Sequence, residues 1–410
     1  MKKIIIGAAL ILAGAAAAFA QDEPTIKFSG DAKTGIYWEQ QQYQGKAPEE
    51  LQEPLKIESH DGDPNGNRWR LNIDFANGNN FGMRTRLDWT NWSNTSSEQP
   101  KFTYAFAYGN FFENQMTVSI GKLGGSPWGS GGPEKWKELE QNNEGGGMRV
   151  EWKPAFIPEE YGRLNAGFVL NGPDKYTDSG ASRTATLADI LLESVIGVAY
   201  THDLFMARFA YRLDSTLDIR DRGTQQDVDR FNGNEGGDMV YRLEEYKLRD
   251  FLPGMAMWAL GVYEGVFAPD PMFYKFENWM FAQYDPPELF NLDTPFTAQI
   301  RLGYDYILLR SEFSVKPSFY WHFNIGEYQK LISAGVSFSY KQDFGQGKIW
   351  EGSPYQQMEL EPKIQLNFSS SYIAFVYNWK TEYVQHYAQR GDKDPTKQTQ
   401  YINLRFCINY

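Results

Sequence analysis

Arginine residues recur at every second position in segments where polar and apolar residues alternate. Arg68 and Arg70 are followed, after a short turn, by Arg84 and Arg86. Residues two apart point to the same side of a β-strand, so these four should form one patch on adjacent antiparallel strands. Guanidinium groups remain charged and bind carboxylates and phosphates through a fork of donors. The spacing predicts an electrostatic field that orients dipolar or anionic solutes.

Other charged residues share this polar face. The full set of candidate lining residues is Arg68, Arg70, Asp74, Arg84, Arg86, Asp88, Arg208, Arg212 and Arg301. A second interpretation stays open. Carboxylates such as Asp74, Asp88 and Glu151 would then merely neutralise the arginines and keep the surface hydrated.

The remaining residues give little support for catalysis or metal binding. The four histidines are scattered and lack metal-ligand spacing. Ser126 and Ser130 lie in a glycine-rich segment that does not match the G-x-S-x-G pattern of hydrolases. We therefore expect no enzyme activity, no resident metal and no cofactor.

One segment weakly resembles a calcium-binding loop. Asp61, Asp63 and Asn65 stand at the first, third and fifth positions of such a loop, but the twelfth position is Asn72 instead of Glu. Asx, Gly and Pro residues also simply form turns, which is the interpretation we favour.

Composition narrows the class of protein. The chain has 410 residues, a net charge of −12 and 16% aromatic residues. Its acidity and the absence of a basic cluster argue against nucleic-acid binding. The longest later apolar stretch, 255–263, is too short to cross a membrane as a helix. A mean hydropathy of −0.55 nevertheless fits a membrane barrel, in which only alternate residues are apolar.

Alternation predicts eighteen strands, and sixteen is the alternative. The predicted segments are 25–38, 68–75, 81–89, 102–109, 115–122, 146–153, 163–171, 194–201, 204–213, 239–249, 254–264, 277–285, 295–304, 307–323, 329–340, 358–368, 371–382 and 399–410. Even-to-odd connections are mostly short and odd-to-even connections mostly long, which is typical of membrane barrels with both termini on one side. A tight turn at Asp305 breaks this rule, and Pro362 predicts an irregularity within a strand.

The N-terminus has the features of a secretory signal peptide. Lys2 and Lys3 precede an apolar run at 4–18, and Ala18-Phe19-Ala20 forms an A-x-A cleavage site. We expect cleavage at about Ala20, leaving 21–410 as a single domain.

The last strand carries alternating apolar residues and ends on an aromatic ring. These residues are Ile402, Leu404, Phe406, Ile408 and Tyr410. Together with the N-terminal segment, this pattern resembles bacterial outer-membrane β-barrels of the porin-like class, whose final strand is read by the barrel-assembly machinery. The fold class expected is all-β, an antiparallel transmembrane barrel.

The resemblance implies a function as well as a fold. It implies an outer-membrane location, contact with lipid and passive diffusion of small hydrophilic solutes, and it admits a homotrimer. Two alternatives remain: a barrel whose long outer loops are adhesive or structural, and a secreted carbohydrate-active β protein.

The glycine-rich segment 124–132 resembles, by position, the porin loop that folds inward and narrows the channel. Residues that would form this constriction are Trp128, Glu134, Lys135, Lys137 and Glu138. An ordinary outer loop is the alternative. If the arginines act as a field, replacing Arg70 and Arg84 with alanine should lower anion preference.

Overall fold

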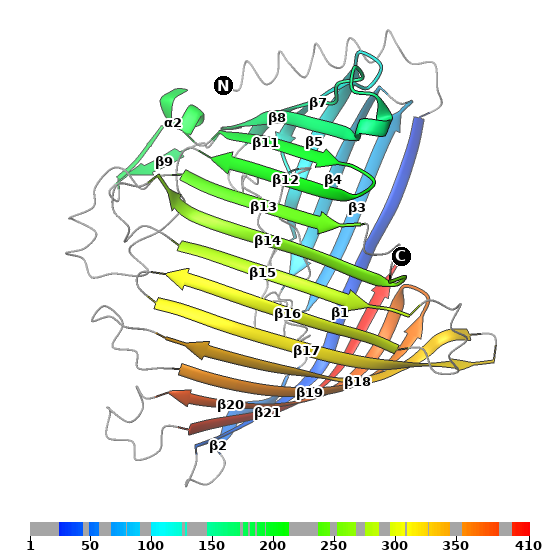
Figure 1. Ribbon diagram of the computed structural model, residues 1–410, viewed down its shortest axis with the longest axis vertical. Helices are drawn as coiled ribbons and strands as arrows, with labels where there is room; N and C mark the ends of the chain where they lie inside the picture. Colours follow the sequence, from blue (N-terminus) through cyan, green and yellow to red (C-terminus); the bar gives the residue numbers. More distant parts are fainter. Residues whose placement is uncertain are drawn as a thin grey trace.

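The chain folds into one closed antiparallel sheet (Figure 1). The computed structural model describes residues 24–43, 49–56, 67–78, 80–90, 100–124, 128, 146–172, 175–178, 181–184, 187–192, 194–212, 237–246, 252–267, 275–286, 296–307, 310–326, 328–344, 355–384 and 396–410. Eighteen strands form the wall, each paired with the strands before and after it. They are β1 (Pro24–Tyr43), β3 (Arg68–Asn77), β4 (Phe81–Thr90), β5 (Lys101–Phe111), β6 (Met116–Lys122), β7 (Gly146–Trp152), β8 (Arg163–Gly172), β11 (Val195–Thr201), β12 (Phe205–Arg212), β13 (Gly237–Glu245), β14 (Met255–Val266), β15 (Lys275–Tyr284), β16 (Phe296–Ile307), β17 (Arg310–Ile325), β18 (Tyr328–Asp343), β19 (Tyr355–Phe368), β20 (Ser371–Val384) and β21 (Thr396–Asn409).

The sheet closes between its first and last strands. Residues 24–33 of β1 pair with β3, whereas residues 31–43 pair with β21. At the end of this seam the backbone N–H groups of Gly30 and Tyr410 donate to each other's carbonyl oxygens, at 2.9 and 3.1 Å. Closure removes the free sheet edges that would otherwise recruit other chains.

The connections carry a few small elements. β2 (Glu49–Lys56) pairs with the second half of β1, and β9 (Lys175–Asp178) and β10 (Ala181–Thr184) form a separate hairpin. The short helix α2 (Leu187–Leu192) follows this hairpin, and the 3₁₀ turn η1 (Glu159–Tyr161) joins β7 to β8. Among the described residues, no helix is long and apolar enough to cross a membrane.

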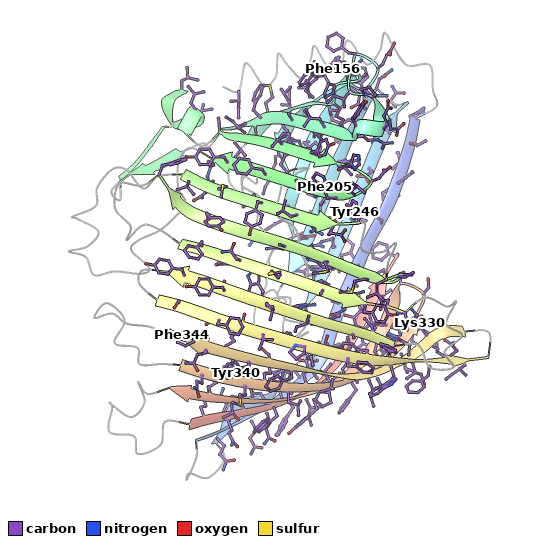
Figure 2. All side chains as sticks on the ribbon, in the orientation of Figure 1. Phe156, Phe205, Tyr246, Lys330, Tyr340 and Phe344 are labelled. Carbon is purple, nitrogen blue, oxygen red and sulfur yellow. The ribbon has the colours of Figure 1, made fainter. Side chains whose placement is uncertain are left out.

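Side chains alternate between the two faces of the wall. On the outer face Phe28 is 64% exposed and Ile364 is 55% exposed, because nothing packs against them. On the inner face their near neighbours, such as Asp31, are charged and largely covered. Rings gather towards both ends of the strands: Phe156 and Phe205 lie at the end that holds the C-terminus, and Phe344 lies at the other (Figure 2). This arrangement suits a wall with hydrocarbon outside and polar groups inside.

The strand count and the strand positions are confirmed. Each of the eighteen predicted segments overlaps one wall strand, in the same order, so the sixteen-strand alternative is wrong. The secreted-protein alternative assumed two packed sheets or a soluble core, whereas the wall is a single sheet closed on itself with its apolar residues exposed.

One local expectation needs correction. Asp305 does not form a turn; it lies within β16 opposite Glu312, and the connection follows Ile307. The irregularity expected at Pro362 is confirmed, because the β19–β20 pairing is interrupted between Leu360 and Lys363 and then resumes in phase. Proline lacks the N–H donor, so only the local pairing is lost.

Candidate functional site in the barrel lumen

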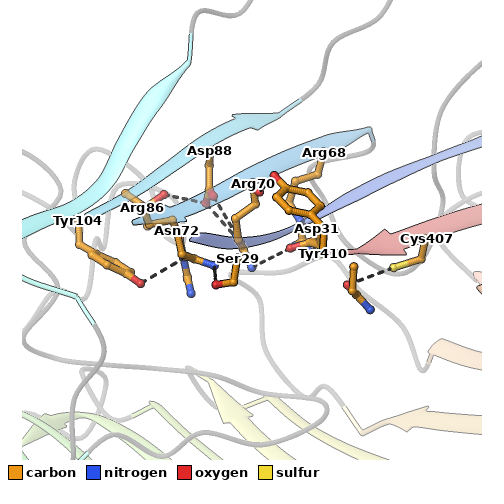
Figure 3. Close-up of polar contacts among 12 residues, drawn as sticks. Ser29, Asp31, Arg68, Arg70, Asn72, Arg86, Asp88, Tyr104, Cys407 and Tyr410 are labelled. Atoms are coloured by element: carbon orange, nitrogen blue, oxygen red, sulfur yellow. Dashed lines mark hydrogen bonds and ion pairs between the residues drawn. The ribbon is translucent and has the colours of Figure 1, made fainter. Parts of the chain in front are cut away.

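An ion-pair network lines the inner face of β1, β3 and β4 (Figure 3). Arg70 Nε lies 2.8 Å from Asp88 Oδ1, and Arg68 Nη2 lies 2.8 Å from Asp31 Oδ2. Arg70 Nη1 also lies 3.8 Å from Asp31 Oδ1, so the two pairs are joined. The strand register brings these residues together, because Arg70 faces Asp31 on one side and Asp88 on the other. At these positions the carboxylates neutralise the arginines, as the second interpretation predicted.

The neighbouring arginines contact different partners. Arg86 Nε donates to Asn72 Oδ1 at 2.8 Å, and its guanidinium carbon lies 4.8 Å from the centre of the Tyr104 ring. The guanidinium carbon of Arg84 lies 5.6 Å from the Tyr108 ring centre. Within the described part of the chain, neither Arg84 nor Arg86 has a carboxylate within ion-pair distance. In the described part of the chain, no ion pair therefore neutralises either charge.

Two more arginines are paired inside the wall. Arg212 Nη2 lies 2.5 Å from Asp238 Oδ2, and Arg149 Nε lies 3.0 Å from Glu151 Oε1. All four residues are buried. The first pair joins β12 to β13 and the second lies within β7, so both serve the wall more than the lumen.

Arg208 lies on the same inner face but opposite another cation. Its register partner is Arg242 on β13, and its Nε lies 3.2 Å from Met206 Sδ. Arg242 itself pairs with Glu244. Arg208 is thus a second source of positive charge on the inner face, six strands along the wall from Arg84 and Arg86.

A stack of rings and guanidinium groups runs across β13–β16. The Trp258 and Phe281 rings stack with centres 3.9 Å apart. Arg242 lies 5.7 Å from the Trp258 ring centre, and Arg301 lies 5.2 Å from the Phe281 ring centre. Cation–π contact stabilises each end of the stack. The sequence indicated the inner face for Arg301 but gave no sign of its aromatic partners, because they come from other strands.

Trp128 lies inside the barrel. Its side chain is 0% exposed, and its Nε1 donates to the backbone oxygen of Asn165 at 3.2 Å. The indole fills the space that side chains at Gly167 and Gly197 would need. Both glycines face inward, because Phe168 and Ile196 beside them are exposed on the outer face.

Apolar side chains surround this tryptophan on the inner wall. They are Phe106, Leu123, Val169, Val195, Ala199, Ala210, Val240 and Val262. An apolar patch facing an aqueous lumen would be unfavourable, so the indole stabilises the wall by covering part of it. The other expected constriction residues, Glu134, Lys135, Lys137 and Glu138, lie outside the described residues.

The structure offers only a partial arrangement for nucleophilic catalysis. His322 faces the lumen, with its Nε2 2.8 Å from Thr297 Oγ1 and its Nδ1 2.8 Å from Ser333 Oγ. A serine nucleophile needs a histidine whose second nitrogen is oriented by a carboxylate. Here a threonine hydroxyl occupies that second nitrogen. His202 lies in the turn between β11 and β12, where its Nδ1 accepts from the Leu204 N–H.

No metal site of the common type is present in the described residues: nowhere do three His, Cys, Asp or Glu side chains converge. The calcium candidates Asp61, Asp63 and Asn65 lie outside the part of the chain that the structure describes. Outside the wall strands, the hydrogen bond from Arg163 lowers the pKa of Glu159 in the β7–β8 turn. Both residues are fully exposed, so this pair has little bearing on the lumen.

The last strand presents its apolar residues outward, as expected. Ile402, Ile408 and Tyr410 are exposed on the outer face, while Cys407 is buried on the inner face. With this strand, the apolar outer band continues around the whole closed wall. The protein is a closed antiparallel β-barrel with an apolar outer face.

Two outer-membrane proteins are among the solved structures to which this chain is similar. Among solved structures, a loop L8 deletion mutant of OmpT, an outer membrane protein of Vibrio cholerae, is 11% identical, with 94% of this chain and 100% of that chain covered and a TM-score of 0.42. A triple mutant of the Rhodopseudomonas blastica porin is 10% identical, with 94% and 100% covered and a TM-score of 0.40. No protein-family model matches the sequence, and no curated protein matches it either. At this identity the barrel's similarity to these structures concerns its fold alone.

Proposed function

We propose that this barrel is a passive channel for small hydrophilic solutes across a bacterial outer membrane. The observation that carries the proposal is the single closed wall of eighteen strands, charged on its inner face and apolar on its outer face. Side chains cannot fill a barrel of this size, so it encloses an aqueous path. The barrel is accordingly not an enzyme and needs no cofactor.

Selection would act by size and by charge. Trp128 reduces the width of the path, because its indole packs against the inner wall. Arg84, Arg86 and Arg208 would supply the field, since the described residues give none of them a carboxylate partner. Arg68, Arg70 and Arg212 contribute less, because each is paired with a carboxylate. The expected preference is for anionic and dipolar solutes.

The partners follow from the same proposal. The exposed outer face would contact outer-membrane lipid, and a homotrimer would cover part of it. The signal peptide would direct export before cleavage at about Ala20. The barrel-assembly machinery would recognise the alternating apolar residues of the last strand, which are Ile402, Leu404, Phe406, Ile408 and Tyr410.

Conductance of the purified barrel in a planar bilayer tests the proposal. A channel gives discrete current steps, and a salt gradient gives a reversal potential on the anion-selective side. A folded barrel that inserts without current steps would contradict it, and would favour a role for the outer loops in adhesion or structure.

A further inference from the structure

Two carboxylates converge on one amide group in the wall formed by β19, β20 and β21. Asn378 Nδ2 donates to Glu359 Oε1 and, at 3.3 Å, to Glu361 Oε2. Tyr401 Oη also donates to Glu361 Oε2, at 3.1 Å. Since a single nitrogen touches both carboxylates, their oxygens border the same small volume.

These carboxylates differ from the others on the inner face. Among the described residues, no basic group lies within ion-pair distance of Glu359 or Glu361. By contrast, carboxylates with a basic partner include Asp31, Asp88, Glu151, Asp238, Glu244 and Glu312. Two close negative charges that lack an ion-pair partner repel each other and favour a bound cation.

The nearest lysines are directed elsewhere. Lys380, which faces Glu359 in the strand register, pairs with Glu382 instead. Lys363 Nζ lies 5.9 and 5.8 Å from the ring centres of Tyr320 and Tyr372. The volume between the two carboxylates therefore receives no lysine.

Buried amides next to this volume lack hydrogen-bond partners. Asn378 and Asn403 are both 0% exposed. Asn378 Oδ1 has no partner within the described structure, and neither does Oδ1 or Nδ2 of Asn403, which lies one register step away on the same face. Buried polar atoms are almost always satisfied, and an unsatisfied one indicates a missing water or ion. Asn378 is informative because its other amide atom already contacts both carboxylates.

We propose that Glu359, Glu361 and Asn378 form a site for a divalent cation of the calcium type. A half-turn of the Asn378 amide exchanges Nδ2 for Oδ1 and presents a third oxygen beside the two carboxylates; the two amide orientations are nearly isosteric. Calcium accepts six to eight oxygen ligands from carboxylates, amide carbonyls and water in irregular geometry. Magnesium requires a near-ideal octahedron and is less suited to this set.

The number of carboxylates sets the expected affinity. With only two carboxylates, the site resembles weak extracellular calcium sites, for which Kd is about 10⁻⁴–10⁻³ M. Binding would also remove negative charge from this wall of the lumen. The inference does not depend on the channel proposal, because binding can be measured on the folded barrel in detergent.

Calcium titration of the chelator-treated, refolded barrel tests the site, by calorimetry and by tyrosine-sensitised terbium luminescence displaced with calcium. We expect saturable binding at one site. Glu359→Gln with Glu361→Gln should weaken it at least tenfold, and Asn378→Asp, which adds a carboxylate, should tighten it. Glu244→Gln is the matched control, because it removes a carboxylate that is paired with Arg242 on another wall.

Three results would overturn the proposal. They are an absence of saturable binding to the unaltered barrel, an equal loss in Glu244→Gln, and weaker binding in Asn378→Asp. If the double variant fails to refold, the unaltered barrel and Asn378→Asp still decide.

Discussion

The ring of Tyr410 lies over Gly30 on the outer face of the barrel, where the first strand meets the last. A side chain at position 30 would place its Cβ 2.6 Å from Tyr410 Oη, which is closer than real side chains approach. Tyr410 Oη donates to the backbone oxygen of Arg70 at 2.7 Å, so the ring reaches across β1 to β3 (Figure 3). The terminal aromatic residue therefore connects three strands at the closing seam.

Replacing Gly30 with alanine should weaken this closure. The added methyl would meet the backbone oxygen of Arg70, 2.0 Å from the ideal Cβ position, as well as the Tyr410 ring. Overpacking of this kind costs about 1–3 kcal/mol. The free energy of unfolding, measured with denaturant in detergent micelles, should fall by that amount. Gly146→Ala is the control, because the nearest atom to a Cβ at that position is 4.0 Å away. Equal stability of the two variants would show that the seam accepts a side chain at position 30.

Replacing Arg212 alone should lower the free energy of unfolding more than replacing both Arg212 and Asp238. Asp238 is 0% exposed, so Arg212→Met leaves a buried carboxylate without its cation. Loss of one partner of a buried pair costs about 3–5 kcal/mol. Combining Arg212→Met with Asp238→Leu should recover most of the loss, because no uncompensated charge remains. A double variant as unstable as the single one would contradict this account.

The arginines without carboxylate partners should set ion selectivity. Replacing Arg86 or Arg208 with glutamine removes one positive charge from the lumen and should move the reversal potential towards cation preference. The reversal potential should be measured at low ionic strength, because 0.1 M salt screens charges over about 10 Å. Arg163→Gln provides the control: it makes the same change of charge at an exposed position paired with Glu159, outside the lumen. A shift in the control as large as in Arg208→Gln would rule out a local effect.

The wall could be predicted from the sequence because its determinants are local. Alternation of polar and apolar residues identifies a strand within ten residues. The apolar residues also predict which face points outward, as at Ile364 and Phe28. Errors were confined to positions where a turn competes with a strand, as at Asp305. There a polar residue within a strand, on the inner face of a wide barrel, resembles a turn residue.

The lumen contacts were less predictable because they join distant strands. The sequence placed Arg70 and Asp88 on one face but could not show that they are in contact, since this depends on register. The stacking of Trp258 on Phe281 and the convergence of Glu359 and Glu361 on Asn378 arise in the same way. Such contacts join residues from different strands, so a local sequence pattern cannot predict them.

Trp128 should control the width of the path. Trp128→Ala removes a fully buried indole from the inner wall, so single-channel conductance should rise. Stability should fall by about 3–5 kcal/mol, as for other large-to-small substitutions in packed regions. The control is Trp152→Ala, which removes an indole that is 44% exposed on the outer face and should leave conductance unchanged.

A second variant separates displacement of the indole from its loss. Gly197→Val keeps Trp128 but places a side chain where the indole lies, so the indole should be forced off the wall. If the indole limits the path, both variants change conductance, and Gly197→Val also increases its fluctuations. Unchanged conductance in both variants would show that the indole lies beside the path of the solutes and does not limit it.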